Sequence, residues 1–301
     1  MREWDNQVKL NSMKREDYSS EKPIPDNIKC LVDEAKNIGD FLSFWLEKRL
    51  LDPPHQEVLD NYYWSYRRHF GQRMRDAYSE QIREAIQLVQ SHPGARVLEM
   101  GCGVGTESLW LAVHGANVVA VDVIGSLIRA ARRRKEILEE LLGRSLQCEF
   151  CQASVMDLDE TESFDVIWME QAFQHLEPRE AVVKKTVRLT KPGGHIIISE
   201  VNALNPLMQI QLFVARGMKM YFTYVDENGK ETVMGNERIV TARWLKRLFD
   251  PHNVHCENIR YFRIFPNHRI FNNLSRVEKL LARRWLAPLQ THFNYVGQRK
   301  G

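Results

Sequence analysis

The spacing of hydrophobic positions changes near residue 93 of this chain. Upstream, apolar residues at 27–51 recur with the 3.6-residue period of amphipathic helices, and an aromatic-rich stretch at 62–70 leads into a helix that ends near residue 89. Downstream of Pro93-Gly94, short apolar runs alternate with helical patterns. Strict alternation of strands and helices predicts an α/β fold with a mostly parallel sheet covered on both faces.

The downstream pattern divides into individual elements. Strands are expected at 96–100, 117–122, 146–152, 164–169, 195–201, 254–264 and 292–298. Helices are expected at 106–114, 126–142, 177–189, 241–249 and 274–285. The stretch at 203–240, with a helical apolar run at 207–222 and a turn at 226–229, is expected to be an insertion over the carboxyl edge of the sheet.

The chain is expected to have three regions. Residues 1–26 are polar and end in a proline-rich run, which predicts a flexible N-terminal tail. Residues 27–79 are expected to form a helical, aromatic-rich segment that helps to bind substrate, and residues 80–301 the main domain with its insertion. A chain of 301 residues, 44% of them hydrophobic, is long enough to bury the core of one large domain with a small lid.

Charge and cysteine content narrow the classes of partner. The 42 basic and 39 acidic residues nearly balance, at a net charge of +3, which disfavours nucleic acid as a partner. Cys148 and Cys151 form a C-x-x-C pair without the helix start of a redox motif or the second pair of a zinc site, so we expect reduced thiols and no metal. The sequence has no signal peptide and no apolar run near the roughly 18 residues of a membrane span, so a soluble, cytoplasmic protein is expected.

Candidate chemistry is concentrated at the end of the first expected strand. Residues 97–100 run directly into Gly101-Cys102-Gly103-Val104-Gly105 and then a helix, so a ligand could approach bare backbone there. The next strand ends about twenty residues later at Asp122, whose carboxylate could accept hydrogen bonds from a ribose or could merely cap the next helix. The spacing is ExGxGxG, beginning at Glu99, and differs from the GxGxxG of dinucleotide sites. An acid here suits a ligand with a cationic amino acid end, although Glu99 could instead pair with a nearby arginine.

Four segments carry a family resemblance. The run VLEMGCGVGTESLWLAVHGANVVAVDV at 97–123 resembles the first two motifs of class I S-adenosyl-L-methionine (SAM) dependent methyltransferases. Residues 164–176 resemble the family's fourth-strand motif, and residues 189–198 its LkPGG turn. The resemblance is close over about 80–202. It implies a Rossmann-like, seven-stranded, mostly parallel sheet with helices on both faces, an N-terminal helical extension, a lid insertion, SAM as cofactor and S-adenosyl-L-homocysteine as product.

The resemblance also implies roles for individual residues. The family's cofactor site corresponds here to Glu99, Gly101 and Gly103 around the methionine part, Asp122 at the ribose, Val123, Ser154 and Val155 around the adenine, and the backbone of Met169 and Glu170. Many relatives carry an aspartate where Ser154 stands, so Asp157 is an alternative contact for the adenine amino group.

Methyl transfer from a sulfonium is an in-line displacement, so the protein aligns the nucleophile and supplies a base where a proton must leave. His175, shortly after the fourth strand, is the expected base, unless it packs the loop as in many relatives. Glu170 and His195 are further candidates for the same role.

The acceptor is less closely defined. The aromatic stretch and the Leu-, Phe-, Met- and Tyr-rich insertion favour a small, partly apolar molecule, although the same residues could form the core of lid helices. Residues 200–206 resemble the EPNxxNP stretch of bacterial methyltransferases that act on small or lipid-linked metabolites, with Val201 in place of the first proline. No Asn/Asp-Pro-Pro-Tyr/Phe motif follows the fourth strand, which disfavours methylation of a DNA base nitrogen.

Other functions remain open on the sequence. An RNA methyltransferase would need the basic residues of 129–135 to form a stripe toward the cofactor, whereas their alternation with alanines fits a solvated helix face. A protein methyltransferase and a non-catalytic SAM-binding protein are further alternatives. The sequence leaves the oligomeric state undecided, and a homodimer is compatible with it.

Overall fold

The centre of the molecule is a seven-stranded sheet with strand order β3-β2-β1-β4-β5-β9-β8. The computed structural model describes residues 35–226, 229–236, 238–265 and 267–301, so the expected tail at 1–26 and the start of the first expected helix lie outside the described residues. Strands β1 to β5 are parallel, and β9 is antiparallel to both β5 and β8. The expected seven-stranded, mostly parallel α/β fold is therefore confirmed.

The strands of this sheet match the expected positions closely. They are β1 Arg96–Met100, β2 Asn117–Asp122, β3 Cys148–Gln152, β4 Phe164–Glu170, β5 Thr190–Val201, β8 Val254–Phe262 and β9 His292–Arg299. Strand β5 begins earlier than the expected residue 195, because residues 191–194 bulge beside β4 between the pairs Phe164–Thr190 and Val166–His195. The expected glycine turn exists within this bulge, where Gly193 has a φ of 79°.

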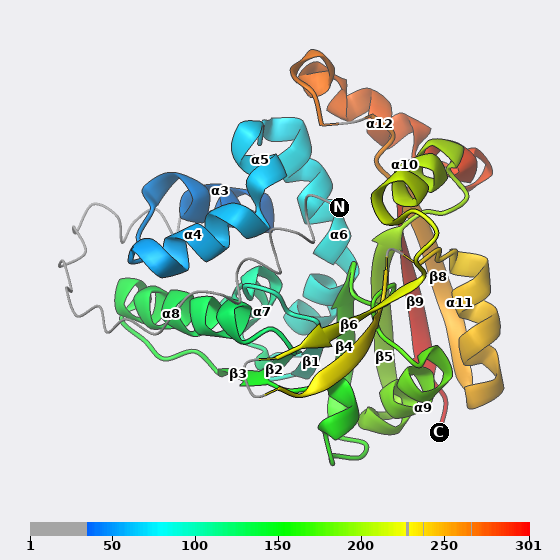
Figure 1. Cartoon of the computed structure of the whole chain (residues 1–301), viewed down its shortest axis with the longest axis horizontal. Helices are drawn as coiled ribbons and strands as arrows, with labels where there is room; N and C mark the ends of the chain where they lie inside the picture. Colours follow the sequence, from blue (N-terminus) through cyan, green and yellow to red (C-terminus); the bar gives the residue numbers. More distant parts are fainter. Residues whose placement is uncertain (1–34, 227–228, 237, 266) are drawn as a thin grey trace.

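Helices cover both faces of the sheet (Figure 1). The helices are α3 Ile38–Lys48, α4 Pro53–Tyr62, α5 Trp64–Arg68, α6 Gln72–Ser91, α7 Thr106–Val113, α8 Gly125–Leu142, α9 Arg179–Leu189, α10 Pro206–Arg216, α11 Ala242–Phe249 and α12 Ser275–Leu281. Short 3₁₀ turns are η1 Val155–Asp157, η2 Asp250–His252, η3 Arg269–Leu274 and η4 Arg284–Leu289. Over the ranges the structure describes, none of the helices is long and apolar enough to cross a membrane.

Alternate residues of the strands divide the interior into two cores. Val97, Val166 and Trp168 belong to the core under α6, α7 and α8, which also includes Phe41 and Trp45 of α3. The opposite face of the same strands packs against α9 and α11. Because successive strand residues point to opposite faces, continuous apolar runs such as the one in β4 fill both cores.

The expected helices at 207–222 and 274–285 were wrong in extent. Helix α10 ends at Arg216, and the chain continues as a hairpin of β6 Tyr221–Val225 and β7 Glu231–Gly235 around the expected turn. The second helix is reduced to α12, between η3 and η4. The backbone leaves the helical conformation at Ala282, with φ −71° and ψ 58°, before η4 begins.

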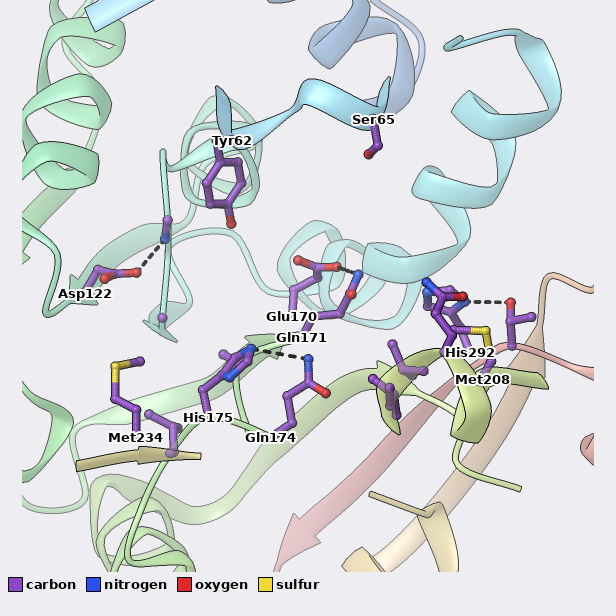
Figure 2. Close-up of a pocket in the computed structure, with 18 of the residues that line it drawn as sticks. Tyr62, Ser65, Asp122, Glu170, Gln171, Gln174, His175, Met208, Met234 and His292 are labelled. Carbon is purple, nitrogen blue, oxygen red and sulfur yellow. Dashed lines mark hydrogen bonds between the residues drawn. The ribbon is translucent and has the colours of Figure 1, made fainter. Parts of the chain in front are cut away.

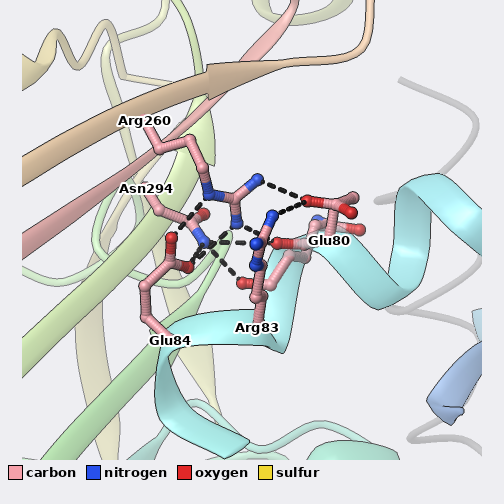
Figure 3. Close-up of polar contacts among 6 residues, drawn as sticks. Glu80, Arg83, Glu84, Arg260 and Asn294 are labelled. Atoms are coloured by element: carbon pink, nitrogen blue, oxygen red, sulfur yellow. Dashed lines mark hydrogen bonds and ion pairs between the residues drawn. The ribbon is translucent and has the colours of Figure 1, made fainter. Parts of the chain in front are cut away.

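Helix α6 is tied to the β8–β9 edge by a charged cluster (Figure 3). Arg260 of β8 donates to Glu84 at 2.5 and 2.9 Å and to Glu80 at 2.9 Å. Asn294 of β9 donates to the carbonyl of Gln81 and to Glu84, both at 2.6 Å. The arginine and these hydrogen bonds outweigh burial, so the pKa of Glu84 lies below its usual value. The N-terminal helical segment is therefore fixed to the sheet across its far strands.

Candidate functional site

A cavity of about 890 Å³ opens at the carboxyl ends of the central strands. From β1 the chain proceeds to β2 and β3 on one side, whereas β4 and β5 lie on the other. Where the strand order reverses in this way, the loops after neighbouring strands diverge and leave a crevice for a ligand. The cavity lies at this point and is closed by residues of α4, α5, α10, the β6–β7 hairpin and η4.

The loop after β1 forms one wall of the cavity. Gly101 and Gly103 both line it, with φ angles of 76° and 53°. The amides of Gly101 and Cys102 both donate to the carbonyl of Val121, at 2.8 and 3.0 Å, and a Cβ on Gly101 would lie 2.7 Å from the Cβ of Ala172. Glycine is therefore required here both by the left-handed backbone and by the close approach of the loop after β4.

Asp122, the last residue of β2, lies at the same wall (Figure 2). Its carboxylate accepts hydrogen bonds from the amides of Gly103 and Ile124, each at 2.9 Å. Burial raises the pKa of Asp122, and these amides oppose the rise. The bonds fix the carboxylate against the glycine loop, and Asp122 caps the loop before α8 as well as facing the cavity.

Tyr62, the last residue of α4, covers the glycine loop. Its side chain points into the cavity (Figure 2), and a Cβ on Gly103 would overlap the tyrosine hydroxyl. Burial, together with the nearby Glu170 and Asp122, raises the pKa of Tyr62 well above its usual value. The phenol is therefore neutral and presents a donor and an aromatic face to any ligand on the loop.

A buried polar network holds this aromatic segment in place. Tyr63 donates to the Thr106 hydroxyl at 2.8 Å, and Tyr78 of α6 donates to Glu107. Arg134, which is fully buried, donates to the same Thr106 hydroxyl at 2.8 Å and to the Val104 carbonyl at 2.6 Å. The start of α7 and the glycine loop are thereby connected to α4, α6 and α8.

Glu170 ends β4 and lines the cavity. One of its oxygens accepts from the side-chain amides of Gln81 at 2.8 Å and Gln171 at 2.7 Å. Burial, helped by the negative Glu107, raises the pKa of Glu170 to about 8. A carboxyl with this pKa is mostly protonated at neutral pH.

His175 lies in the loop after β4, also facing the cavity (Figure 2). Its Nδ1 lies 2.9 Å from the carbonyl oxygen of Gly235, and its Nε2 lies 3.3 Å from the side-chain nitrogen of Gln174. A carbonyl only accepts, so Nδ1 carries the hydrogen and Nε2 carries the lone pair of the neutral ring. This tautomer is the one in which Nε2 can take up a proton.

The cavity brings together most of the residues expected from the sequence. The expected residues that line it are Gly101, Gly103, Asp122, Val123, Ser154, Val155, Glu170 and His175. Glu99 and Met169 are not part of the lining. Glu99 is 1% exposed beneath the loop and accepts a hydrogen bond from Ser108, and the side chain of Met169 is fully buried in the core under α9.

The other candidates lie apart from the cavity lining. His195 lies within β5 beside Glu257, 3.3 Å away, and Asp157 pairs with Lys230 of the hairpin at 2.5 Å. The sequence analysis did not single out Tyr62, Gln174 or His292, which do line the cavity. The aromatic stretch at 62–70 could have indicated Tyr62 as a site residue. His292 begins a strand whose sequence pattern is ordinary, so nothing in the sequence indicated its place in the cavity.

Part of this chain is similar to known methyltransferases. Residues 98–198 match the family model described as "Methyltransferase domain". The ubiquinone biosynthesis O-methyltransferase of Xanthomonas oryzae pv. oryzae (strain PXO99A) is 36% identical over 111 residues, which is 36% of this chain and 44% of that protein. The protein of the same name from Xylella fastidiosa (strain M23) is 34% identical over 111 residues, covering 36% of this chain and 43% of that protein. This chain thus matches less than half the length of these curated relatives.

Solved structures share the fold. A putative sarcosine dimethylglycine methyltransferase from Galdieria sulphuraria superposes with a TM-score of 0.52 at 14% identity, covering 75% of this chain and 88% of that one. A SAM-dependent methyltransferase from Methanosarcina mazei gives a TM-score of 0.51 at 17% identity, covering 69% of this chain and 94% of that one. At these identities the likeness is one of architecture.

Proposed function

We propose that this chain is a class I, SAM-dependent methyltransferase that transfers a methyl group from SAM to an oxygen, nitrogen or carbon nucleophile of a small, partly apolar acceptor, which the family model matched by residues 98–198 supports. One observation carries the proposal. The glycine loop and Asp122 share a single cavity with Glu170, His175 and the apolar residues of α10 and η4. The cavity therefore has room and chemistry for a polar cofactor beside an apolar acceptor.

The residues of the cavity fit the proposed cofactor. Gly101 and Gly103 bring the loop backbone to the cavity wall, and the Asp122 carboxylate faces the cavity, where it can accept from ribose hydroxyls. Val123 and Val155 offer apolar contacts to the adenine, and Ser154 a hydroxyl. When bound, SAM supplies a methyl group on a positively charged sulfur. Glu99 would act from beneath the loop, because its side chain does not reach the cavity.

His175 is the proposed base. The Gly235 carbonyl fixes the tautomer in which Nε2 carries the lone pair, and this atom is the one proposed to remove a proton from an acceptor hydroxyl or amine. Glu170 is proposed to balance the positive charge of the cofactor, because its buried carboxyl can lose a proton as the cation enters.

The acceptor end of the cavity is apolar. Val201, Leu207, Leu212 and Leu289 contribute to this part of the lining. The curated relatives are named as O-methyltransferases of ubiquinone biosynthesis, which supports an oxygen nucleophile on an apolar or lipid-linked acceptor. Exclusion of water by these side chains would keep the nucleophile in line with the methyl group.

The basic run on α8 gives little support to an RNA acceptor. Arg134 is buried over the ring of Trp45, Arg132 donates to the Phe150 carbonyl, and Lys135 pairs with Glu139. These side chains are used within the fold and form no stripe toward the cavity. A protein methyltransferase and a SAM-binding protein without turnover remain alternative proposals.

Calorimetric titration of SAM and S-adenosyl-L-homocysteine tests the cofactor part of the proposal. Wild type should bind both, and Asp122→Ala should weaken both by about 10- to 100-fold, since a hydrogen bond to a charged group contributes roughly 1.5–3 kcal/mol. Asp165→Ala, a carboxylate outside the cavity, is the matched control. Absence of binding by wild type would refute the function. Binding with no transfer of labelled methyl to any acceptor in cell extracts would favour the non-catalytic alternative.

A further inference from the structure

Helix α10 carries an apolar face that no part of the described chain covers. Leu207, Ile210, Phe213 and Val214 lie along it, and each is at least half exposed. Met218, just beyond the helix, is 84% exposed. Soluble proteins rarely leave several large apolar side chains together in water unless the patch meets a partner or a lipid phase.

A second exposed apolar group lies in the segment from η3 to η4. Ile270, Leu280 and Leu289 are each more than half exposed, and Trp285 is 79% exposed. An exposed tryptophan is typical of positions at a lipid–water interface, where its ring is apolar and its N–H remains solvated.

The two groups border the same opening. Leu207 of α10 and Leu289 of η4 both line the cavity while remaining largely exposed. Asn202, before α10, donates to the carbonyls of Ala287 and Gln290, both at 2.8 Å, which joins the two segments. Figure 1 shows α10 and α12 at the same end of the molecule. We call these exposed side chains, from Leu207 to Met218 and from Ile270 to Leu289, the mouth surface.

The mouth surface is strongly basic as well as apolar. Its exposed charged residues are Arg269, Arg276, Lys279, Arg283 and Arg284. The one acidic residue between 269 and 289, Glu278, is buried and pairs with Arg73 at 3.1 Å. No ion pair among the described residues involves any of the five basic side chains. Their charge is therefore exposed and is not neutralised by an ion pair within the described part of the chain.

We propose that the mouth surface docks on the anionic face of a phospholipid bilayer, with its apolar side chains in the headgroup region and its arginines and lysine on lipid phosphates. Apolar groups ringed by cations complement this surface, which is apolar inside and negative outside. If the proposed function holds, docking would allow a lipid-linked acceptor to pass from the bilayer into the cavity that Leu207 and Leu289 line. Only this consequence rests on the proposed function. The docking itself requires neither cofactor nor catalysis.

Sedimentation of the full chain with vesicles tests the docking, without SAM or acceptor. The protein should sediment with vesicles of phosphatidylcholine mixed with phosphatidylglycerol, far less with phosphatidylcholine alone, and added salt should weaken the binding. Arg283→Gln/Arg284→Gln should lower the partition coefficient about 25-fold, at roughly a factor of five per basic residue. Val214→Ser/Trp285→Ser, which changes residues outside the cavity lining, should lower it at least about tenfold.

Matched controls separate docking from general charge and hydrophobicity. Arg144→Gln/Lys184→Gln removes two exposed cations elsewhere, and Val225→Ser removes an exposed apolar side chain of β6; both should bind vesicles like wild type. Equal binding to the two kinds of vesicle, or equal loss in the controls, would overturn the proposal. A stable dimer that ignores vesicles and that Val214→Ser/Trp285→Ser makes monomeric would assign the surface to a second copy instead. SAM binding measured on the same samples reports separately on the proposed function.

Discussion

Glu170 provides a quantitative test of the electrostatics of the cavity. Its folded-state pKa of about 8 exceeds the usual glutamate pKa of 4.5 because the carboxyl is buried near Glu107. A carboxyl with a raised folded pKa contributes its full stability below the unfolded pKa and loses it as the pH rises through the folded pKa. Wild type should therefore lose stability relative to Glu170→Gln between pH 4.5 and 8. Over the two units from about pH 6 to pH 8 the difference in unfolding free energy should change by about 2 kcal/mol.

The measurement is denaturant unfolding of both proteins at several pH values, with the difference in unfolding free energy plotted against pH. Glu84→Gln is the matched control, since the pKa of Glu84 is lowered by Arg260 (Figure 3) and its contribution is lost only in acid, below the unfolded pKa. The unfolding free energy of Glu84→Gln minus that of wild type should be constant above about pH 6. The unfolding free energy of Glu170→Gln minus that of wild type should rise with pH. A flat Glu170→Gln profile would refute the assignment of a neutral carboxyl, and with it the proposed release of a proton when SAM binds.

Three further substitutions test the cavity. Gly103→Ala should weaken SAM binding, measured by calorimetry, by at least about tenfold, because the new Cβ would overlap Tyr62. Gly94→Ala is the control, since Gly94 has a φ of 82° but open space around the position of a Cβ. This control should lower the folding stability by only the roughly 1–2 kcal/mol of left-handed backbone and leave SAM binding unchanged. Tyr62→Ala should weaken SAM binding alone but restore part of the loss in Gly103→Ala; strictly additive losses would contradict the predicted contact. His175→Asn should lower kcat about 100- to 10,000-fold with little change in the KM for SAM, whereas His195→Asn should leave turnover unchanged, and equal effects of the two would exclude His175 as the base.

The sequence predicted the central strands well because they are buried on both faces. The run from Phe164 to Glu170 is largely apolar and is followed by a polar loop and the helix α9. The same order placed the glycine loop and Asp122 at the carboxyl edge. Those positions depend on local spacing, which a single sequence displays directly.

The errors have a common physical origin in long-range packing. Arg134 follows the pattern of a solvated helix face, yet Trp45, almost ninety residues away, stacks on its guanidinium at 4.6 Å and excludes water. The β6–β7 hairpin was missed because the apolar residues before it continue the helical period of α10, while the pairing of Tyr221 with Gly235 decides the strand. Periodicity records which residues avoid water and carries no information about which partner covers them.

The cap of the cavity shows why function is harder to predict than fold. The cap is formed by α4, α10 and η4, which lie far apart in the chain. Taken alone, each of these segments has the sequence pattern of an ordinary amphipathic or apolar stretch. Only their assembly places Tyr62 over the glycine loop and brings Leu207 and Leu289 to the lining of one cavity. The cofactor end is built from loops that follow adjacent parallel strands, so its geometry follows from topology. The acceptor end is built from α10 and η4, which lie outside that topology. Variants of these two elements should therefore change which acceptor is methylated without changing the affinity for SAM.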